Sequence, residues 1–144
     1  MKKIKFIVAI VTLFFSYNAM AQKEYLTTEE IPQKISTYIN EHFPDNTIVY
    51  GKKKIKTSKA EYEVKLKNDI EIEFDGNMEV KEIESDIPLP QSVVPKKIWD
   101  YVASNYPNNK IFEWKKKRGY QKVELDNDYD LYFDLAGNFT ELKR

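Results

Sequence analysis

The sequence contains two copies of one pattern, and this repeat constrains the fold more than any other feature. The segment YEVKLKNDIEIEFDGNMEVKEI, residues 62–83, returns as QKVELDNDYDLYFDLAGNFTEL, residues 121–142. Each copy alternates apolar with charged residues and is interrupted by Asn-Asp and by a turn after Phe-Asp. This pattern predicts a meander of three short antiparallel strands.

A second pair of matching segments precedes the meanders. IPQKISTYINEHFPDNTI, residues 31–48, aligns without a gap with VPKKIWDYVASNYPNNKI, residues 94–111. Apolar residues recur at helical spacing behind the first proline, and a second proline closes the helical pattern. The end of each segment and the lysines that follow predict one further strand that leads into a lysine-rich turn. Upstream, Thr27 and Glu30 have the spacing of a capping box in a polar lead before the first helix.

These patterns predict an α+β fold made of two tandem α-β-β-β-β repeats. Only one face of each meander is apolar, which favours an antiparallel sheet with both helices packed on one face and an open face opposite. We assign residues 22–84 to repeat 1, residues 85–93 to a proline-containing linker and residues 94–144 to repeat 2. Units of roughly 50 residues are marginal alone, so the repeats are expected to share a core. Met78 aligns with Gly137, so the first turn is expected to use Gly76 and Asn77 instead.

The first 21 residues have the pattern of a secretory signal peptide. A basic start precedes a short apolar run, and Ala19-Met20-Ala21 provides a cleavage site. The apolar run is shorter than a membrane-spanning helix, so no membrane insertion is expected after cleavage. The chain has no cysteine and therefore forms no disulfide. We expect a periplasmic or secreted protein, slightly acidic after cleavage, which argues against a nucleic-acid partner.

Residues typical of catalysis are scarce. His42 is the only histidine, there is no cysteine to pair with it, and no serine lies in a Gly-x-Ser-x-Gly elbow. His42 is expected to be exposed. The sequence therefore predicts neither an enzyme nor a cofactor.

One segment resembles the start of a calcium loop. Asp126, Asp128 and Asp130 provide oxygen ligands at the appropriate spacing. Leu131 and Gly137 stand where such a loop needs glycine and glutamate. A hairpin turn is the simpler interpretation, and calcium binding remains the alternative.

The open face of the sheet is the predicted binding surface. If Ile111 is buried, Phe112 and Trp114 point outward together with Tyr132, as aromatic anchors inside a charged rim. The alternative is that Phe112 and Trp114 pack into the core between the repeats. The polar residues expected on this face are Glu71, Glu73, Lys122, Glu124 and Asp130. The basic runs Lys52–Lys54 and Lys115–Arg118 are expected at charged hairpin ends, with contact to an anionic polymer as the alternative.

The repeated Pro-led helix, its terminal Phe-Pro or Tyr-Pro, and the motif Y-E-V-x-L-x-N-D-x-x-I-x-F-D resemble the PepSY-like, putative beta-lactamase-inhibitor-like proteins exported by Bacteroidetes. The resemblance implies a tandem fold similar to beta-lactamase inhibitor protein and a periplasmic or secreted location. It also raises inhibition of an exported enzyme as a function. The resulting hypothesis is a non-enzymatic binding module with a protein partner. The alternative is an envelope structural protein or one that binds a small ligand, calcium or a polymer.

Overall fold

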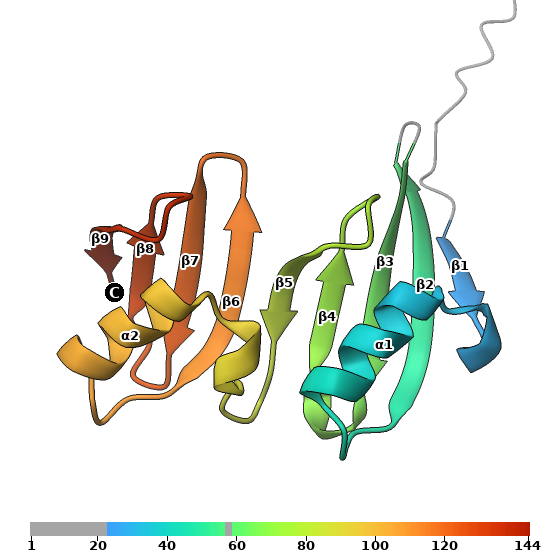
Figure 1. Cartoon of the computed structure of the whole chain (residues 1–144), viewed down its shortest axis with the longest axis horizontal. Coiled ribbons are helices and arrows are strands. Elements are labelled where there is room, and N and C mark those ends of the chain that lie inside the picture. The colour runs from blue at the N-terminus through green and yellow to red at the C-terminus, as the bar shows by residue number, and fades with distance from the viewer. Residues whose placement is uncertain (1–22, 57–58) are drawn as a thin grey trace, which may run out of the picture.

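The structure is a computed structural model that describes residues 23–56 and 59–144. The predicted signal peptide, residues 1–21, lies outside the described residues. A continuous antiparallel sheet of nine strands runs in chain order from β1 to β9, and both helices lie on the same side of it (Figure 1). The elements are β1 Lys23–Leu26, α1 Gln33–His42, β2 Ile48–Lys56, β3 Lys59–Leu66, β4 Glu71–Phe74, β5 Val80–Glu84, α2 Lys96–Asn105, β6 Ile111–Lys117, β7 Tyr120–Leu125, β8 Asp130–Phe133 and β9 Phe139–Lys143.

The predicted α+β fold and its two helix-plus-four-strand repeats are confirmed. Strands β2 to β5 follow α1, and β6 to β9 follow α2. The repeats share one sheet because β5 pairs with β6, with Ile83 opposite Trp114. Residues 85–93 extend this junction, since the N–H of Ser85 donates to the carbonyl of Phe112 at 3.0 Å and that of Leu89 to Ile111 at 2.8 Å.

Both helices pack against the sheet through equivalent residues. Ile35 and Ile39 of α1 and Ile98 and Val102 of α2 are buried, as their spacing predicts. Tyr38 meets Phe74 edge to face with ring centroids 5.8 Å apart. In repeat 2, Tyr101 meets Phe133 at 5.4 Å in the same way.

The core lies between the helices and the sheet and follows the alternation in the sequence. Four aligned pairs of strand residues are buried on this side: Val64 and Val123, Leu66 and Leu125, Ile72 and Leu131, and Phe74 and Phe133. Each fully buried side chain of this size stabilises the fold by about 1.5–3 kcal/mol. Within the described residues, neither helix has the length and apolar character needed to cross a membrane.

Strand β1 was not predicted, because its four residues show no apolar alternation. It pairs with β2, with Leu26 opposite Gly51, in the position that β5 occupies beside β6. The capping box predicted at Thr27 forms, with the N–H of Thr27 donating to Glu30 Oε2 at 2.8 Å. It caps a short 3-10 helix, Thr28–Glu30, rather than α1. Helix α1 begins only after Pro32. Ile31, the residue before this proline, is extended because a following proline disfavours helical backbone angles.

Gly76 and Asn77 lie in the β4–β5 turn, as expected, but they do not replace the left-handed residue that Gly137 provides in the second copy. Met78 has a φ of 63°, and its aligned partner Gly137 has a φ of 80°. The N–H of Met78 donates to the carbonyl of Asp75 at 2.9 Å, as that of Gly137 does to Asp134 at 3.0 Å. The two turns are therefore equivalent, and Met78 adopts a left-handed conformation that glycine adopts without steric cost.

The placement of the basic runs at hairpin ends is confirmed for Arg118, which lies in the β6–β7 turn, and is wrong for most of the other residues. Lys52 and Lys54 lie within β2, and Lys115 and Lys117 lie within β6. These lysines face strands that carry glutamates at matching positions, so the runs are integral to the sheet surface.

Candidate binding surfaces

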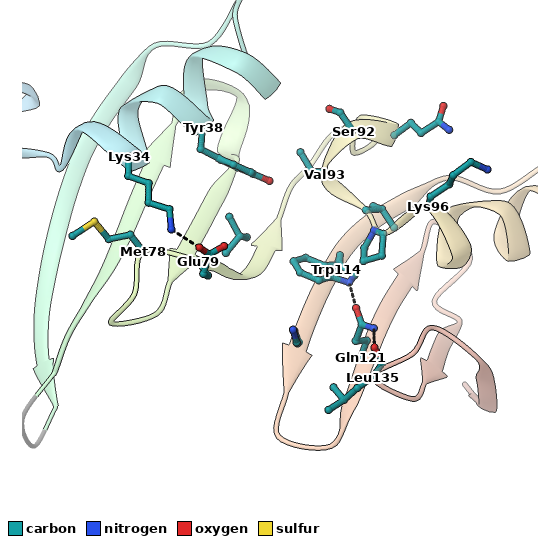
Figure 2. Close-up of a pocket in the computed structure, with 15 residues that line it drawn as sticks. Lys34, Tyr38, Met78, Glu79, Ser92, Val93, Lys96, Trp114, Gln121 and Leu135 are labelled. Carbon is teal, nitrogen blue, oxygen red and sulfur yellow. Dashed lines mark hydrogen bonds and ion pairs between the residues drawn. The ribbon is translucent and has the colours of Figure 1, made fainter.

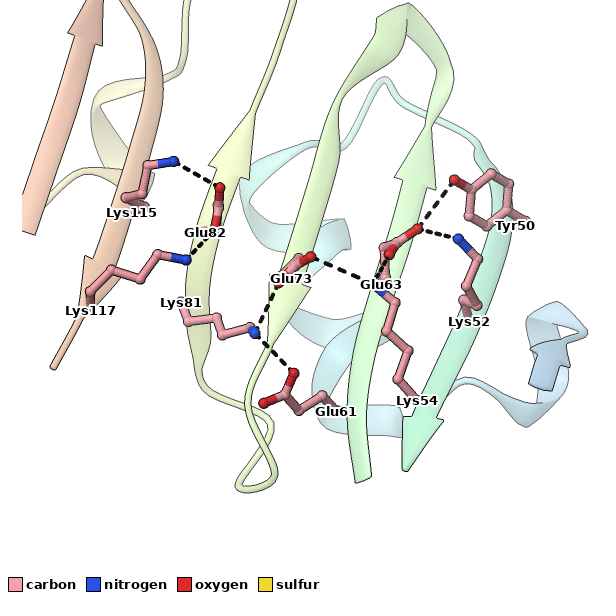
Figure 3. A network of polar contacts seen from close by, with 10 residues as sticks. All are labelled: Tyr50, Lys52, Lys54, Glu61, Glu63, Glu73, Lys81, Glu82, Lys115 and Lys117. Carbon is pink, nitrogen blue, oxygen red and sulfur yellow. Dashed lines mark hydrogen bonds and ion pairs between the residues drawn. The ribbon is translucent and has the colours of Figure 1, made fainter. Parts of the chain in front are cut away.

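The sheet face opposite the helices carries a network of paired lysines and carboxylates, which we call the charged face. Figure 3 shows its first half. Lys52 and Lys54 both pair with Glu63 of β3, and Lys81 pairs with Glu73 at 2.9 Å. Across the repeat junction, Glu82 pairs with Lys115 at 3.1 Å and with Lys117 at 2.9 Å. Opposite charges thus alternate along and across the strands.

Lys122 is the centre of the second half of the charged face. Its ammonium group lies 2.8 Å from Asp130, 3.2 Å from Glu124 and 3.3 Å from Glu113. Burial acts to lower the pKa of Lys122, but its hydrogen bond to Asp130 and the charge of Glu113 outweigh burial and raise the pKa. Lys122 therefore remains charged although its side chain is largely buried.

Most of the charged residues predicted for this face have partners within the molecule. Glu73, Lys122, Glu124 and Asp130 all take part in the ion pairs, and Glu71 lies beside them on β4. A binding partner would have to desolvate these pairs, and the cost of desolvation offsets much of the electrostatic gain. The charged face therefore provides solubility and order more readily than binding energy.

Glu63, Glu71 and Glu73 are the one group of described carboxylates that bring ligand atoms within 4.8 Å of one another. Burial and the neighbouring Glu63 carboxylate raise the pKa of Glu71. Lysines already neutralise Glu63 and Glu73, however. This cluster is an ion-pair network rather than a vacant set of metal ligands.

Tyr132 was predicted to point to the open face of the sheet, and its side chain lies on this charged face. Its ring lies 5.7 Å from that of Tyr120 and 4.7 Å below the ammonium group of Lys143. It is half-buried by these neighbours.

Trp114 does not belong to the charged face, and its expected role as an anchor on this face was wrong. A β-bulge between Ile111 and Glu113 changes the phase of β6. As a result Ile111 and Trp114 both point to the helix side, whereas Glu113 and Lys115 point to the charged face. Phe112 lies at the bulge and is half-buried. Of the two alternatives for Trp114, packing between the repeats is the observed one.

Trp114 forms part of an open groove between the two repeats on the helix side of the sheet, shown in Figure 2. We call it the inter-repeat groove, and its volume is about 840 Å³. Apolar side chains come from α1, the β4–β5 turn, β5, the segment before α2, β6 and the β8–β9 turn, with lysines at the margins. Its lining includes Lys34, Tyr38, Met78, Glu79, Val80, Val93, Lys96, Trp114, Lys116, Gln121 and Leu135.

Trp114 is fixed by a hydrogen-bonded chain. Its indole Nε1–H donates to Gln121 Oε1 at 3.2 Å, and Gln121 Nε2 donates to the carbonyls of Asp134 at 3.2 Å and Leu135 at 3.4 Å. Gln121 thus holds the Trp114 ring and the turn that carries Leu135 in one arrangement. The Leu135 side chain remains 54% exposed.

Repeat 1 has no counterpart of Trp114. Gly51 occupies the aligned position, and a Cβ there would lie 2.9 Å from Cδ1 of Ile31. Ile31 therefore packs against the bare backbone of Gly51. The tryptophan is a feature of repeat 2 alone, and it lies at the junction because β6 is the strand that pairs with β5.

Met78 of the other repeat is also among the residues that line the inter-repeat groove, and in Figure 2 its side chain extends away from Trp114. A methionine in the left-handed region costs about 1 kcal/mol relative to glycine, and such strain persists where the surrounding structure imposes it. Met78 packs against the core and lines the groove. The alignment of Met78 with Gly137 indicated a left-handed residue at this position of the turn. Gly76 and Asn77 were instead expected to take the place of that glycine.

The aspartates predicted as calcium ligands do not converge on one point. Asp126 accepts a hydrogen bond from Asn109 Nδ2 at 2.8 Å, and Asp130 pairs with Lys122. Asp128 has a φ of 61° and forms the β7–β8 turn, as the hairpin interpretation predicts. Asp126 and Asp128 do, however, line a hollow of about 340 Å³. This acidic hollow is lined by Glu84, Ser85, Asp86, Phe112, Glu113, Glu124, Leu125, Asp126 and Asp128.

His42 lies at the end of α1 and is half-buried rather than exposed as expected. Its ring centroid lies 4.3 Å from that of Tyr38. Its Nδ1 atom is buried and has no hydrogen-bond partner among the described residues. The imidazole therefore serves as a packing group beside Tyr38.

The fold and these surfaces define a class of small tandem-repeat α+β proteins with one open sheet face and a groove at the repeat junction. The family model described as "Putative beta-lactamase-inhibitor-like, PepSY-like" matches residues 18–82 and 60–141. The chain belongs to this PepSY-like family, as its resemblance implied.

Solved structures share the fold. A putative periplasmic protein of the DUF2874 family from Bacteroides vulgatus is 28% identical with a TM-score of 0.79, and the match covers 85% of this chain and 97% of that one. A putative calcium-regulated periplasmic protein from Bacteroides thetaiotaomicron is 26% identical with a TM-score of 0.79 and the same coverage, 85% and 97%. A third structure, a putative periplasmic protein of unknown function from Bacteroides vulgatus, is 25% identical with a TM-score of 0.78, covering 85% and 100%. A search of curated proteins finds no significant match.

Proposed function

We propose that this protein is a non-enzymatic binding module of the cell envelope and that its inter-repeat groove holds an apolar segment of a partner protein. The observation that carries this proposal is the apolar lining that the two repeats share: Tyr38 and Met78 come from repeat 1, and Trp114, held by its hydrogen bond to Gln121, comes from repeat 2.

The composition of the groove supports this proposal. Tyr38, Met78 and Trp114 are among its lining residues, and Tyr, Met and Trp are enriched in the energetic centres of protein interfaces. Leu135 offers further exposed apolar surface at one end. At the margin Lys34 pairs with Glu79 and Lys96 pairs with Asp100 at 2.6 Å, so the apolar side chains rather than charge favour a partner segment. Binding of this kind acts by steric occlusion, which agrees with an inhibitor-like family and the periplasmic neighbours.

A comparison of two double variants in affinity capture from envelope extracts tests this function. Met78→Gly with Leu135→Ser removes apolar groove side chains and leaves the charged face intact. Tyr120→Ser with Tyr132→Ser is the matched control on the charged face. We expect the first variant to lose the partner that the wild type recovers and the second to keep it. Loss in the second variant alone would place the binding surface on the charged face, as the sequence predicted, and would refute the groove.

Calcium binding in the acidic hollow is a second candidate function. The solved relative described as calcium-regulated motivates it, together with the carboxylates of β5, β6 and the β7–β8 turn that line one hollow. Burial and a hydrogen bond with Glu113 raise the pKa of Glu124. A cation bound by several of these oxygen atoms would stabilise the ionised carboxylates of Glu113 and Glu124.

Calcium titration followed by thermal unfolding tests the second candidate. If calcium binds in the hollow, millimolar calcium raises the Tm of the wild type and not that of an Asp126→Asn, Asp128→Asn variant. Asp45→Asn and Asp100→Asn, which are remote from the hollow, serve as the matched control and should keep the response. An equal response in all three proteins, or none, excludes calcium binding at this site.

A further inference from the structure

Strand β9 forms an exposed edge of the sheet, and its charge pattern is complementary to that of an identical strand in antiparallel orientation. The sheet ends at β9, and no described strand lies beyond it. Along β9, Glu141 and Lys143 flank Leu142, and in the sheet they lie opposite Tyr132 and Asp130 of β8. Glu141 and Lys143 therefore point to the charged face, and Leu142, opposite the buried Leu131, points to the helix side.

The aligned strand of repeat 1 shows how such an edge is used. Glu82, Ile83 and Glu84 of β5 align with Glu141, Leu142 and Lys143 of β9. Glu82 lies opposite Lys115 of β6 and forms an ion pair with it at 3.1 Å, while Ile83 lies opposite Trp114. Ile83 has no exposed surface, whereas Leu142 is 40% exposed. The same strand position is thus paired on both sides in repeat 1 and on one side in repeat 2.

We infer that β9 pairs antiparallel with β9 of a second copy of this chain, about a two-fold axis at Leu142. In this register Leu142 faces Leu142 of the second copy on the helix side. Glu141 of each copy faces Lys143 of the other on the charged face, which makes two equivalent ion pairs. This isologous contact joins the two sheets into one and continues the ion-pair pattern of the charged face across the junction.

A second copy fits this edge better than an unrelated strand for two reasons. The Glu-Leu-Lys order is self-complementary only in antiparallel pairing of identical strands, since a shift of register would bring like charges together. The side chains of Glu141 and Lys143 are also 55% and 53% exposed, and their ion pair with each other at 3.3 Å can be exchanged for pairs across the interface. The inference is independent of the proposed groove function, because β9 does not line the groove.

Charge reversal at β9 tests the inference by sedimentation velocity over a wide concentration range. The wild type should approach twice the monomer mass as its concentration rises. Glu141→Lys and Lys143→Glu should each weaken the dimer about tenfold, because opposite pairs become like pairs at two symmetric places. The double variant Glu141→Lys, Lys143→Glu should restore wild-type association, since its reversed charges again face opposite charges.

Circular dichroism of each variant verifies that the exposed substitutions leave the monomer folded. A wild type that stays monomeric at all concentrations would overturn the inference. So would a double variant that associates no better than the single ones, because recovery by the swap is specific to self-pairing in this register.

Discussion

At the scale of single residues, the sequence predicts which side chains are buried and fails where the backbone departs from regular alternation. Val64, Leu66 and Phe74 belong to the apolar alternation of the first meander, which predicts one buried face, and all three are buried. Trp114 was assigned to the wrong face because one bulge residue reverses the phase of the strand. The positive φ of Met78 was missed because methionine rarely adopts it.

Substitutions of Met78 should therefore reverse the usual order of alanine and glycine. We expect Met78→Gly to be more stable than Met78→Ala by about 1 kcal/mol, because both lose the same packing and only glycine relieves the left-handed strain. Urea unfolding of both variants measures this difference. Gly137→Ala, the matched change in repeat 2, should destabilise by about 1 kcal/mol or more. An alanine variant as stable as the glycine variant would show that the turn is not strained.

At the scale of secondary-structure elements, the helices and the meander strands were predictable, and the edges were not. Helices α1 and α2 have clear apolar stripes behind a proline, and the strands of both meanders alternate regularly. Strand β1 forms because β2 offers a free edge, and this tertiary cause leaves no periodic trace in four residues. The lysine runs were misplaced for a related reason: only the glutamates on neighbouring strands explain why lysines lie within β2 and in the last three residues of β6.

The charged face should show opposite pH responses at two of its glutamates. Burial and the Glu63 carboxylate raise the pKa of Glu71 above its unfolded value of 4.5. Ionised Glu71 is therefore unfavourable in the folded state, and Glu71→Gln should increase the free energy of unfolding at pH 7. That gain should vanish as the pH falls through the raised pKa and below 4.5.

Glu82→Gln is the matched comparison. Burial acts to raise the pKa of Glu82, but hydrogen bonds from Lys117 and Lys115 outweigh it and lower the pKa below 4.5. Its replacement should reduce the free energy of unfolding at pH 7. The loss should disappear in acid, because the Glu82 carboxylate of the wild type is then protonated and no longer pairs with the lysines. Urea unfolding at several pH values measures both effects. The same sign for both variants at pH 7 would contradict the assignment of Glu71 as strained and Glu82 as paired.

At the scale of the whole molecule, the internal repeat made the fold predictable, because two aligned copies separate the conserved core from the varied surface. The repeat could not predict the inter-repeat groove. The groove arises where α1 and α2 flank the β5–β6 junction, and its walls combine Tyr38 and Met78 of one copy with Trp114 and Leu135 of the other. Neither copy contains this arrangement by itself, so a comparison of the two copies predicts the open sheet face as the binding surface and not the groove.

Site-specific photocrosslinking in the intact envelope tests the groove most directly. A benzoylphenylalanine at Leu135, whose side chain is exposed at the groove margin, is compared with one at Tyr132 on the charged face. The account predicts a crosslinked partner from position 135, lost when Met78→Gly is added, and none from position 132. A partner captured from position 132 and not from position 135 would contradict the assignment of the groove as the binding site.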